Sequence, residues 1–164
     1  MTVPKGGEGA TSVAGMAVGE TRVARLAADR TSTSGSFGDV EGLAFTIDAD
    51  AEYLIECFLH FRSGSVLNGL GLALNGPASP TAVALWTLIA TGLTTMLAGA
   101  ARAYDSGTAA GLIDTADADS PAALTGLLRN GANAGTLALR YKSATALLSV
   151  TIRAGSWARI TRTL

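Results

Sequence analysis

The sequence has little cysteine, histidine or charge, and each shortage excludes a class of site. Cys57 is the only cysteine, so neither an internal disulfide nor a cysteine-built zinc site can form. His60 is the only histidine, which excludes a histidine-rich metal site and leaves one residue for any Ser/His/Asp triad. The chain also lacks the GxSxG nucleophile elbow. We therefore expect a protein without enzymatic activity, bound metal or cofactor.

The shortage of charge bears on the partners of the protein. Charged residues make up 15% of the 164 residues, against about 25% in an ordinary soluble domain, and hydrophobic residues make up 48%. A net charge of −1 leaves no basic footprint for nucleic acid or an anionic membrane, so we expect neither as a partner. A surface so weakly charged is typical of one that a protein partner covers in part.

The first twenty residues, "MTVPKGGEGATSVAGMAVGE", lack the continuous apolar core of a signal peptide. Their Gly, Ala, Ser and Thr content buries too little apolar surface to order the segment by itself. We predict an extended or flexible N-terminal arm over residues 1–20 and a single domain over residues 21–164. The lone cysteine fits synthesis in a reducing cytoplasm.

Alternation of apolar and polar residues is the main signal in the rest of the chain, and it predicts β-strands. In the longest run, "AEYLIECFLHFRSG", one face carries Tyr53, Ile55, Cys57, Leu59 and Phe61. The pattern recurs in "GLAFTID", "GLGLALN", "GTLALRYKS" and "ALLSVTIRAG", with Gly, Asn and Pro turns between the runs. Short strands of this kind predict an all-β fold, an antiparallel β-sandwich.

The other face of the longest run is too polar for a core and too apolar for ordinary solvent exposure. It carries Leu54, Glu56, Phe58, His60 and Arg62. We interpret this mixed face as a contact surface, with Glu56, Phe58, His60 and Arg62 as interface candidates. A histidine in such a position is more often a sheet-face or interface residue than a catalytic one.

Four further interface candidates come from other runs. In the run 69–74, Gly69 and Gly71 lie with Ala73 on one face and reduce it to Gly and Ala, which allows another backbone or sheet to approach closely. Arg140 is predicted to point outward from the run 135–143, and the ring of Trp157 can cover an edge of the sandwich.

The segment from Thr81 to Ala101 contains no charged residue and allows three interpretations. Its length could cross a bilayer, and an amphipathic helix is the second alternative. The β-branched residues and the alternating runs on both sides favour a pair of strands broken near Gly92. We predict the pair of strands.

Two groups of residues carry weak signals for chemistry. "LIDTADADSPA" gathers Asp114, Asp117 and Asp119, which could hold calcium, but the spacing is not that of an EF-hand, and a solvated turn is the preferred interpretation. Cys57 alternates with apolar residues, where a thiol behaves as a small hydrophobe.

Several strings taken in order resemble one set of proteins. These strings are "DVEGLAFTIDADAEYLIECFLHFRSGS", "GLGLALNGPASP", "LTGLLRNGANAGTLALRYKS" and "VTIRAGSW". Together they resemble bacteriophage virion proteins of the head-decoration, tail or fibre type, over about residues 21–160. The matching positions are Gly42, Leu43, Tyr53, Glu56, Gly76, Pro77, Gly126, Gly135, Leu137, Arg140, Gly155, Ser156 and Trp157.

The resemblance implies a jelly-roll-like sandwich that assembles as a trimer and has no enzymatic activity. It also implies a virion location after assembly in the host cytoplasm, with the major capsid protein or other virion proteins as partners. One departure stands out: an acidic residue expected soon after "LRYKS" is absent, since Ala144 and Thr145 follow. This departure puts in doubt any ion pair to Arg140 that the relatives use.

Three functions remain open at this point. A head-decoration or cement protein is favoured, because the chain lacks the heptads and repeated shaft motifs of a long fibre. A tail or fibre module that binds a host receptor is the alternative, and Trp86, Tyr104 and Trp157 are the aromatic residues available for it. A small β-sandwich hydrolase would depend on His60.

Overall fold

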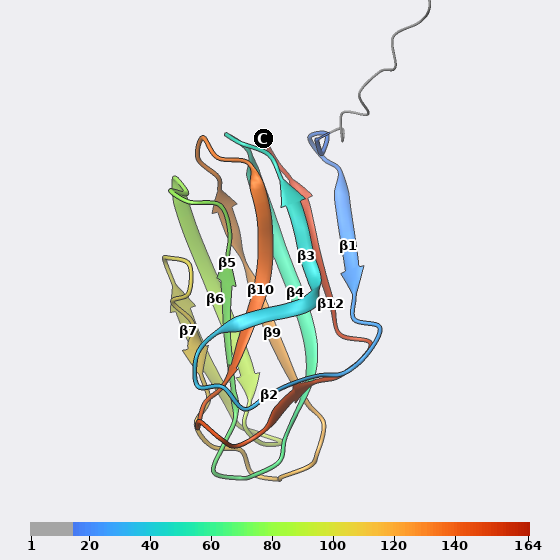
Figure 1. The fold of residues 1–164 in the computed structure, drawn as a ribbon, viewed down its shortest axis with the longest axis vertical. Helices are drawn as coiled ribbons and strands as arrows, with labels where there is room; N and C mark the ends of the chain where they lie inside the picture. Colours follow the sequence, from blue (N-terminus) through green and yellow to red (C-terminus); the bar gives the residue numbers. More distant parts are fainter. Residues whose placement is uncertain (1–14) are drawn as a thin grey trace, which may run out of the picture.

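The computed structural model describes residues 15–164, which fold into two antiparallel sheets packed face to face (Figure 1). The strands are β1 Thr21–Arg25, β2 Arg30–Ser32, β3 Gly38–Ile47, β4 Glu52–Ser63, β5 Leu70–Asn75, β6 Ala82–Ala90, β7 Met96–Ala101, β8 Thr108–Ala109, β9 Ser120–Arg129, β10 Gly135–Ser143, β11 Val150–Ile152 and β12 Trp157–Arg162. The larger sheet has the order β1-β12-β4-β9-β6-β7, with β11 pairing with β2 and β4. The smaller sheet has the order β3-β10-β5-β8. The predicted all-β sandwich is confirmed.

The strand order within the two sheets is that of a jelly roll. Eight strands form the orders β4-β9-β6-β7 and β3-β10-β5-β8, and from β3 to β10 the chain changes sheet at every step except at the β6–β7 hairpin. Eight strands wound in this way as two Greek keys make a double-sheet jelly roll.

Two additional strands widen the larger sheet on the β4 side. β12 pairs along β4 from Trp157 opposite Phe58 to Arg162 opposite Tyr53, and β1 pairs along the far side of β12. A turn at Gly155, whose φ is +89°, separates β12 from β11. The end of the chain therefore lies inside the larger sheet and not at its edge.

The uncharged segment from Thr81 to Ala101 forms a β-hairpin. β6 and β7 pair from Leu85 opposite Ala101 to Ala90 opposite Met96, and the turn between them contains Gly92. The predicted pair of strands is therefore confirmed. Residues 15–164 contain no helix, and thus none that is long and apolar enough to span a membrane.

The core lies between the sheets and is built from the faces that alternation predicts. On β4, Tyr53, Ile55, Cys57, Leu59 and Phe61 are at most 3% exposed. The smaller sheet adds a second set of buried side chains, which includes Leu70, Leu72, Leu74, Leu137, Leu139 and Tyr141. A strand with alternating residues buries one face because successive side chains point to opposite sides of the sheet.

The packed domain begins before residue 21. Met16 is buried in the core cluster, and its backbone N–H donates to Asp48 Oδ2 at 3.1 Å. The Gly19 N–H donates to the Arg162 carbonyl at 2.8 Å. Residues 15–20, which we assigned to the arm, therefore lie against the sandwich, and the rest of the predicted arm, residues 1–14, lies outside the described residues.

Candidate interaction surface

The sequence-predicted contact residues of β4 lie on the face of the larger sheet that points away from the core. We call this surface the outer face. Leu54 and Phe58 are 45% and 40% exposed on it, and His60 is exposed as well. Glu56 and Arg62 lie on the same face, because they share its period of two. Both are half-buried.

An aromatic cluster forms where β4 pairs with β12. Phe58 lies opposite Trp157 in the register, and their rings are stacked with centroids 6.5 Å apart. The His60 ring meets Phe58 edge-on at 5.6 Å. The backbone holds this arrangement in place, since the His60 N–H donates to Oγ of the fully buried Ser156 at 3.0 Å. Phe58, His60 and Trp157 are thus brought together, and the ring of Trp157 lies on the outer face.

The charged candidates on the outer face are already paired within the chain. Arg159 on β12 donates two hydrogen bonds to the Glu56 carboxylate, at 2.6 and 3.0 Å, and lies 5.8 Å from the Trp157 ring. The bidentate contact lowers the pKa of Glu56 and raises the pKa of Arg159. Arg62 donates to Asp119 at 3.0 Å.

The other half of the outer face, on β9, β6 and β7, was missed in the sequence interpretation. Trp86 is 57% exposed at its centre, with Thr125 of β9 on one side and Ala100 of β7 on the other. A hollow beside the indole is lined by Ala84, Leu85, Trp86, Ala100, Ala101, Arg102, Thr125 and Gly126. The absence of charge from Thr81 to Ala101 was the available signal for this surface.

Gly69 and Gly71 lie elsewhere. Gly71 is in β5 of the smaller sheet and Gly69 directly precedes this strand, and other segments of the same chain bury both. A Cβ at Gly69 would lie 2.0 Å from the Ala110 carbonyl oxygen, and a Cβ at Gly71 would lie 2.6 Å from Lys142 Cγ. The backbone that approaches Gly69 closely is therefore the segment just after β8 of the same chain, whereas Gly71 is covered by the Lys142 and Ala109 side chains. They do not contribute to the outer face.

Arg140 also lies on the smaller sheet, away from the outer face. It forms ion pairs with Asp39 at 2.9 Å and with Asp105 at 2.5 Å. The hydrogen bond to Asp105 is the main cause of its raised pKa. The acidic partners of Arg140 thus come from β3 and from the loop after β7, which compensates for the missing acidic residue after "LRYKS".

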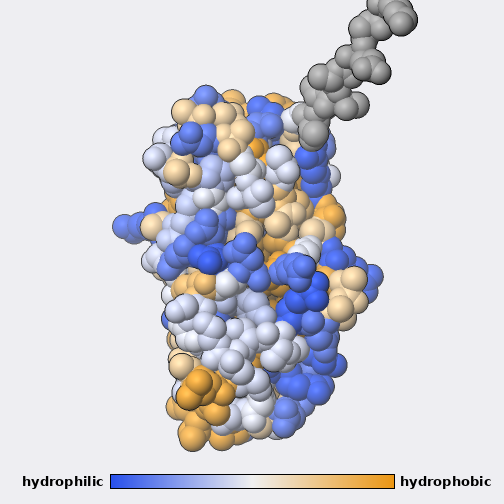
Figure 2. Space-filling view, in the orientation of Figure 1, coloured by the Kyte–Doolittle hydropathy of each residue, from blue (hydrophilic) through white to orange (hydrophobic). Residues whose placement is uncertain are grey.

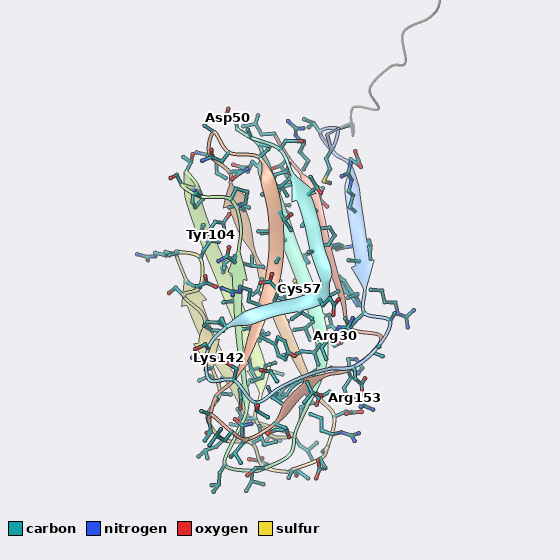
Figure 3. The ribbon with its side chains drawn as sticks, in the orientation of Figure 1. Arg30, Asp50, Cys57, Tyr104, Lys142 and Arg153 are labelled. Carbon is teal, nitrogen blue, oxygen red and sulfur yellow. The ribbon has the colours of Figure 1, made fainter. Side chains whose placement is uncertain are left out.

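The residues considered for chemistry have structural surroundings. Cys57 lies near the middle of the sandwich (Figure 3), where burial raises the pKa of its thiol to about 12. Asp119 of the acidic loop pairs with Arg62 at 3.0 Å and with Arg153 at 3.4 Å. Within residues 15–164, no three His, Cys, Asp or Glu side chains gather in a way that could hold a metal ion.

One end of the sandwich carries exposed aliphatic side chains. Figure 2 shows hydrophobic residues gathered at the lower left of the molecule, the end that carries the β4–β5 and β10–β11 loops. These loops expose Val66, Leu67 and Leu147, and Thr145 Oγ1 ties them together through a hydrogen bond to the Leu67 carbonyl at 2.9 Å. We call this surface the loop end.

Comparisons with known proteins include a weak structural likeness among the solved structures. No family model and no curated protein matches the sequence. A solved chain described as "Structure of infectious bursal disease virus Gx strain" shares 15% identity with a TM-score of 0.27, over 98% of this chain and 44% of that one. The chain thus spans less than half the length of this viral protein, and a TM-score so low establishes neither a common fold nor a common function.

Proposed function

We propose that the protein is a structural component of a bacteriophage particle, a trimeric decoration or cement protein that binds and stabilises the head shell. The observation that carries the proposal is the jelly-roll strand order, an architecture used by viral capsid proteins, lectins and cupins. A cupin-type metal site is not favoured, because the single histidine of the chain lies exposed on the outer face. Fold alone does not determine function, and the exposed Phe58 and Trp86 side chains of the outer face support a binding role.

The mechanism of such a protein is mechanical. Trimers that clamp neighbouring shell subunits stabilise the shell through apolar area buried between chains, at about 25 cal/mol per Å² before the costs of association. The loop end offers exposed aliphatic side chains for this contact. The protein would act without cofactor or catalysis, in the virion, after assembly in the host cytoplasm.

A tail or fibre module that binds a host receptor is the second candidate. The exposed aromatic side chains Phe58 and Trp86 favour it, together with the stacked ring of Trp157. Amphipathic aromatic rings are common anchors in recognition surfaces. Binding of the purified protein to host cells or glycans, lost in Trp86→Ala, would support this candidate over the first.

The two candidates are separated by adding labelled protein to phage particles assembled without this protein and imaging where the label binds. We expect the label to lie over the head shell. We also expect the shell with bound protein to disassemble at a higher temperature than the shell without it. Label confined to the tail would overturn the decoration role.

A chain lacking residues 1–14 tests the proposed arm in the same assay. The deletion stops at residue 14 because Met16 belongs to the core. We expect the shortened chain to fold like the full chain and to bind heads more weakly. Equal binding of the two chains would remove the arm from the proposal.

A further inference from the structure

One sheet edge lacks the features that normally keep an edge from pairing with another chain. Within residues 15–164, β1, β2, β3, β7 and β8 each pair on one side only. Charges, bulges and shortness protect such edges. β1 carries Arg22 and Arg25, β3 has a bulge where the φ of Gly42 is +102°, and β2 and β8 are three and two residues long. β7, at the edge of the larger sheet opposite β1, has six residues with no charge, proline or positive φ (Figure 1).

The backbone of β7 presents unpaired hydrogen-bonding groups on its free side. Opposite residues of an antiparallel pair are alternately hydrogen-bonded and not. The Thr91 N–H donates to the Thr95 carbonyl at 2.9 Å, so every second residue from Leu97 to Ala101 continues this set of bonds to β6. The intervening residues point their N–H and C=O groups away from β6, and no other strand of residues 15–164 pairs with them; these are Met96, Ala98 and Ala100. The group that fits this edge is an extended strand.

Two charges at opposite ends of β7 determine which strand fits. Arg102 directly follows β7. Asp114 lies at the turn that precedes β7: its N–H donates to the Thr91 carbonyl at 2.7 Å, and its carboxylate packs against Gly92. The ion pairs within residues 15–164 include neither charge. An antiparallel partner strand that satisfies both carries an acidic group where it begins and a basic group where it ends, and β7 of a second copy has this arrangement.

We infer that two copies of this chain pair antiparallel through β7, so that their larger sheets become one continuous sheet. A strand paired antiparallel with its own copy makes a closed two-fold contact, because each copy gives and receives the same groups. The inference goes beyond the proposed function. The contact holds two copies and no third, so on a head shell it would join copies that belong to neighbouring trimers.

The register of the contact follows from the free backbone groups. Only residues whose N–H and C=O groups point to the free side can form hydrogen-bonded pairs, and a two-fold axis at Ala98 pairs almost the whole strand. Met96 then lies opposite Ala100 of the second copy. Ala100 lies opposite Trp86 of β6, so the long Met96 and Trp86 side chains, 62% and 57% exposed in the single chain, can cover each other above this small residue.

The same register brings the two unpaired charges together. Arg102 of one copy comes opposite Thr94 of the other, in the turn against which Asp114 packs. The two-fold axis repeats this contact, so the pairing forms two identical Arg102–Asp114 ion pairs. Charge complementarity of this kind fixes the register of an interface.

The first test uses single cysteines in the full chain, since the native Cys57 is buried. Ala98→Cys places two thiols across the axis at a Cα separation of about 5.5 Å, which suits a disulfide. Ala84→Cys is the matched control: Ala84 is also exposed on the outer face, but β6 of the two copies would lie about 14 Å apart. Under mild oxidation we expect disulfide-linked dimers of Ala98→Cys at concentrations where the control stays unlinked. An unlinked Ala98→Cys, or equal linking of both variants, overturns the inference.

The second test reverses the charges and measures mass by sedimentation equilibrium over a range of concentrations. In Arg102→Glu two like charges face each other at both ends of the contact, and we expect its dissociation constant to rise at least about 10-fold. Adding Asp114→Arg to this variant should restore association, because both ion pairs re-form with exchanged signs. Arg25→Glu, at an exposed arginine on the opposite edge of the sheet, is the control and should change nothing. A double variant that associates no better than Arg102→Glu overturns the inference.

The two measurements together separate the inference from the proposed trimer. Trimers whose Ala98→Cys variant stays unlinked overturn the β7 contact and leave the trimer intact. Linked dimers with no larger species support the β7 contact and overturn the trimer. A wild type that is monomeric at tens of micromolar, with no cross-linking, overturns both. If Ala98→Cys does not fold, as judged by its thermal transition, the charge reversal decides the question.

Discussion

At the scale of single residues, three hydrogen bonds of the buried interior meet at the Asn68 side chain. This side chain is fully buried, and its Nδ2 donates to the Ser149 carbonyl at 3.1 Å. Its Oδ1 accepts from Ser143 Oγ at 2.9 Å and from the Thr145 N–H at 2.8 Å. One amide thus ties the β4–β5 loop to the β10–β11 loop, and the geometry of the loop end depends on it.

We predict that Asn68→Ala destabilises the fold by about 2–4 kcal/mol. The substitution removes the three hydrogen bonds of a fully buried amide and leaves the Thr145 N–H without its acceptor, whereas the Ser149 carbonyl keeps the Gly64 N–H and the Ser143 hydroxyl keeps the Leu148 carbonyl. Urea unfolding followed by circular dichroism measures the change. Asn133→Ala is the control, because Asn133 is exposed and its side chain donates one hydrogen bond, to the Ala78 carbonyl at 2.9 Å; we expect a loss of about 1 kcal/mol or less. Equal losses in the two variants would contradict the role of Asn68.

At the scale of elements, β5 and the short β8 meet with almost no space between their backbones. The Ala110 N–H donates to the Leu70 carbonyl at 3.0 Å, and the Ala110 carbonyl oxygen lies where a Cβ of residue 69 would be. A side chain at this position must displace backbone, which a packed interior resists.

We therefore predict that Gly69→Ala costs about 2–4 kcal/mol of stability, by displacing the segment around β8. Gly111→Ala is the matched control, because it lies next to Ala110, has no atom within 4 Å of its added Cβ and needs no positive φ. The free energies of unfolding of the two variants in urea give the comparison. A cost of less than 1 kcal/mol for Gly69→Ala would mean that the β8 segment moves freely.

The same elements show how far the sequence could be interpreted. The alternation in β4 predicted both its buried and its outward residues, because a strand covered on one side imposes a period of two. Gly69, just before β5, and Gly71, within it, predicted a close approach of backbone, but alternation holds no information on which segment approaches. The approaching segment is β8 of the same chain, whose two residues are too few to show a period.

The half of the outer face on β9, β6 and β7 was missed for a related reason. Trp86 alternates with Leu85 and Thr87 inside a run without charge, so the sequence alone does not distinguish its exposed face from its buried one. The distinction arises only when β9 and β7 pair on either side of β6 and the second sheet covers one face. The aromatic cluster likewise depends on the pairing of β12 with β4, which joins residues about a hundred positions apart.

At the scale of the whole molecule, the last strand of the chain holds the larger sheet together. β12 lies between β1 and β4, and its buried Ala158 and Ile160 are at most 1% exposed. Thr21 and Thr161, which share a hydrogen bond between β1 and β12, are 140 positions apart. Contacts so distant in sequence are typical of slow folding, because the chain must close long loops before the pairing forms.

We predict that loss of β12 pairing abolishes cooperative folding. In a chain ending at Gly155, β1 has no strand to pair with and most of β4 becomes an unpaired sheet edge, since β12 separates the two in the larger sheet. Ile160→Asp should have nearly the same effect in the full chain, because it buries an unpaired carboxylate. Arg159→Gln, one position earlier on the exposed side, removes an ion pair that is open to solvent and screened by it, and should leave the stability nearly unchanged. Differential scanning calorimetry would show a single sharp transition for Arg159→Gln and none for the other two. A sharp transition in the shortened chain would mean that β1 can take the place of β12 beside β4, and the larger sheet would then close without the end of the chain.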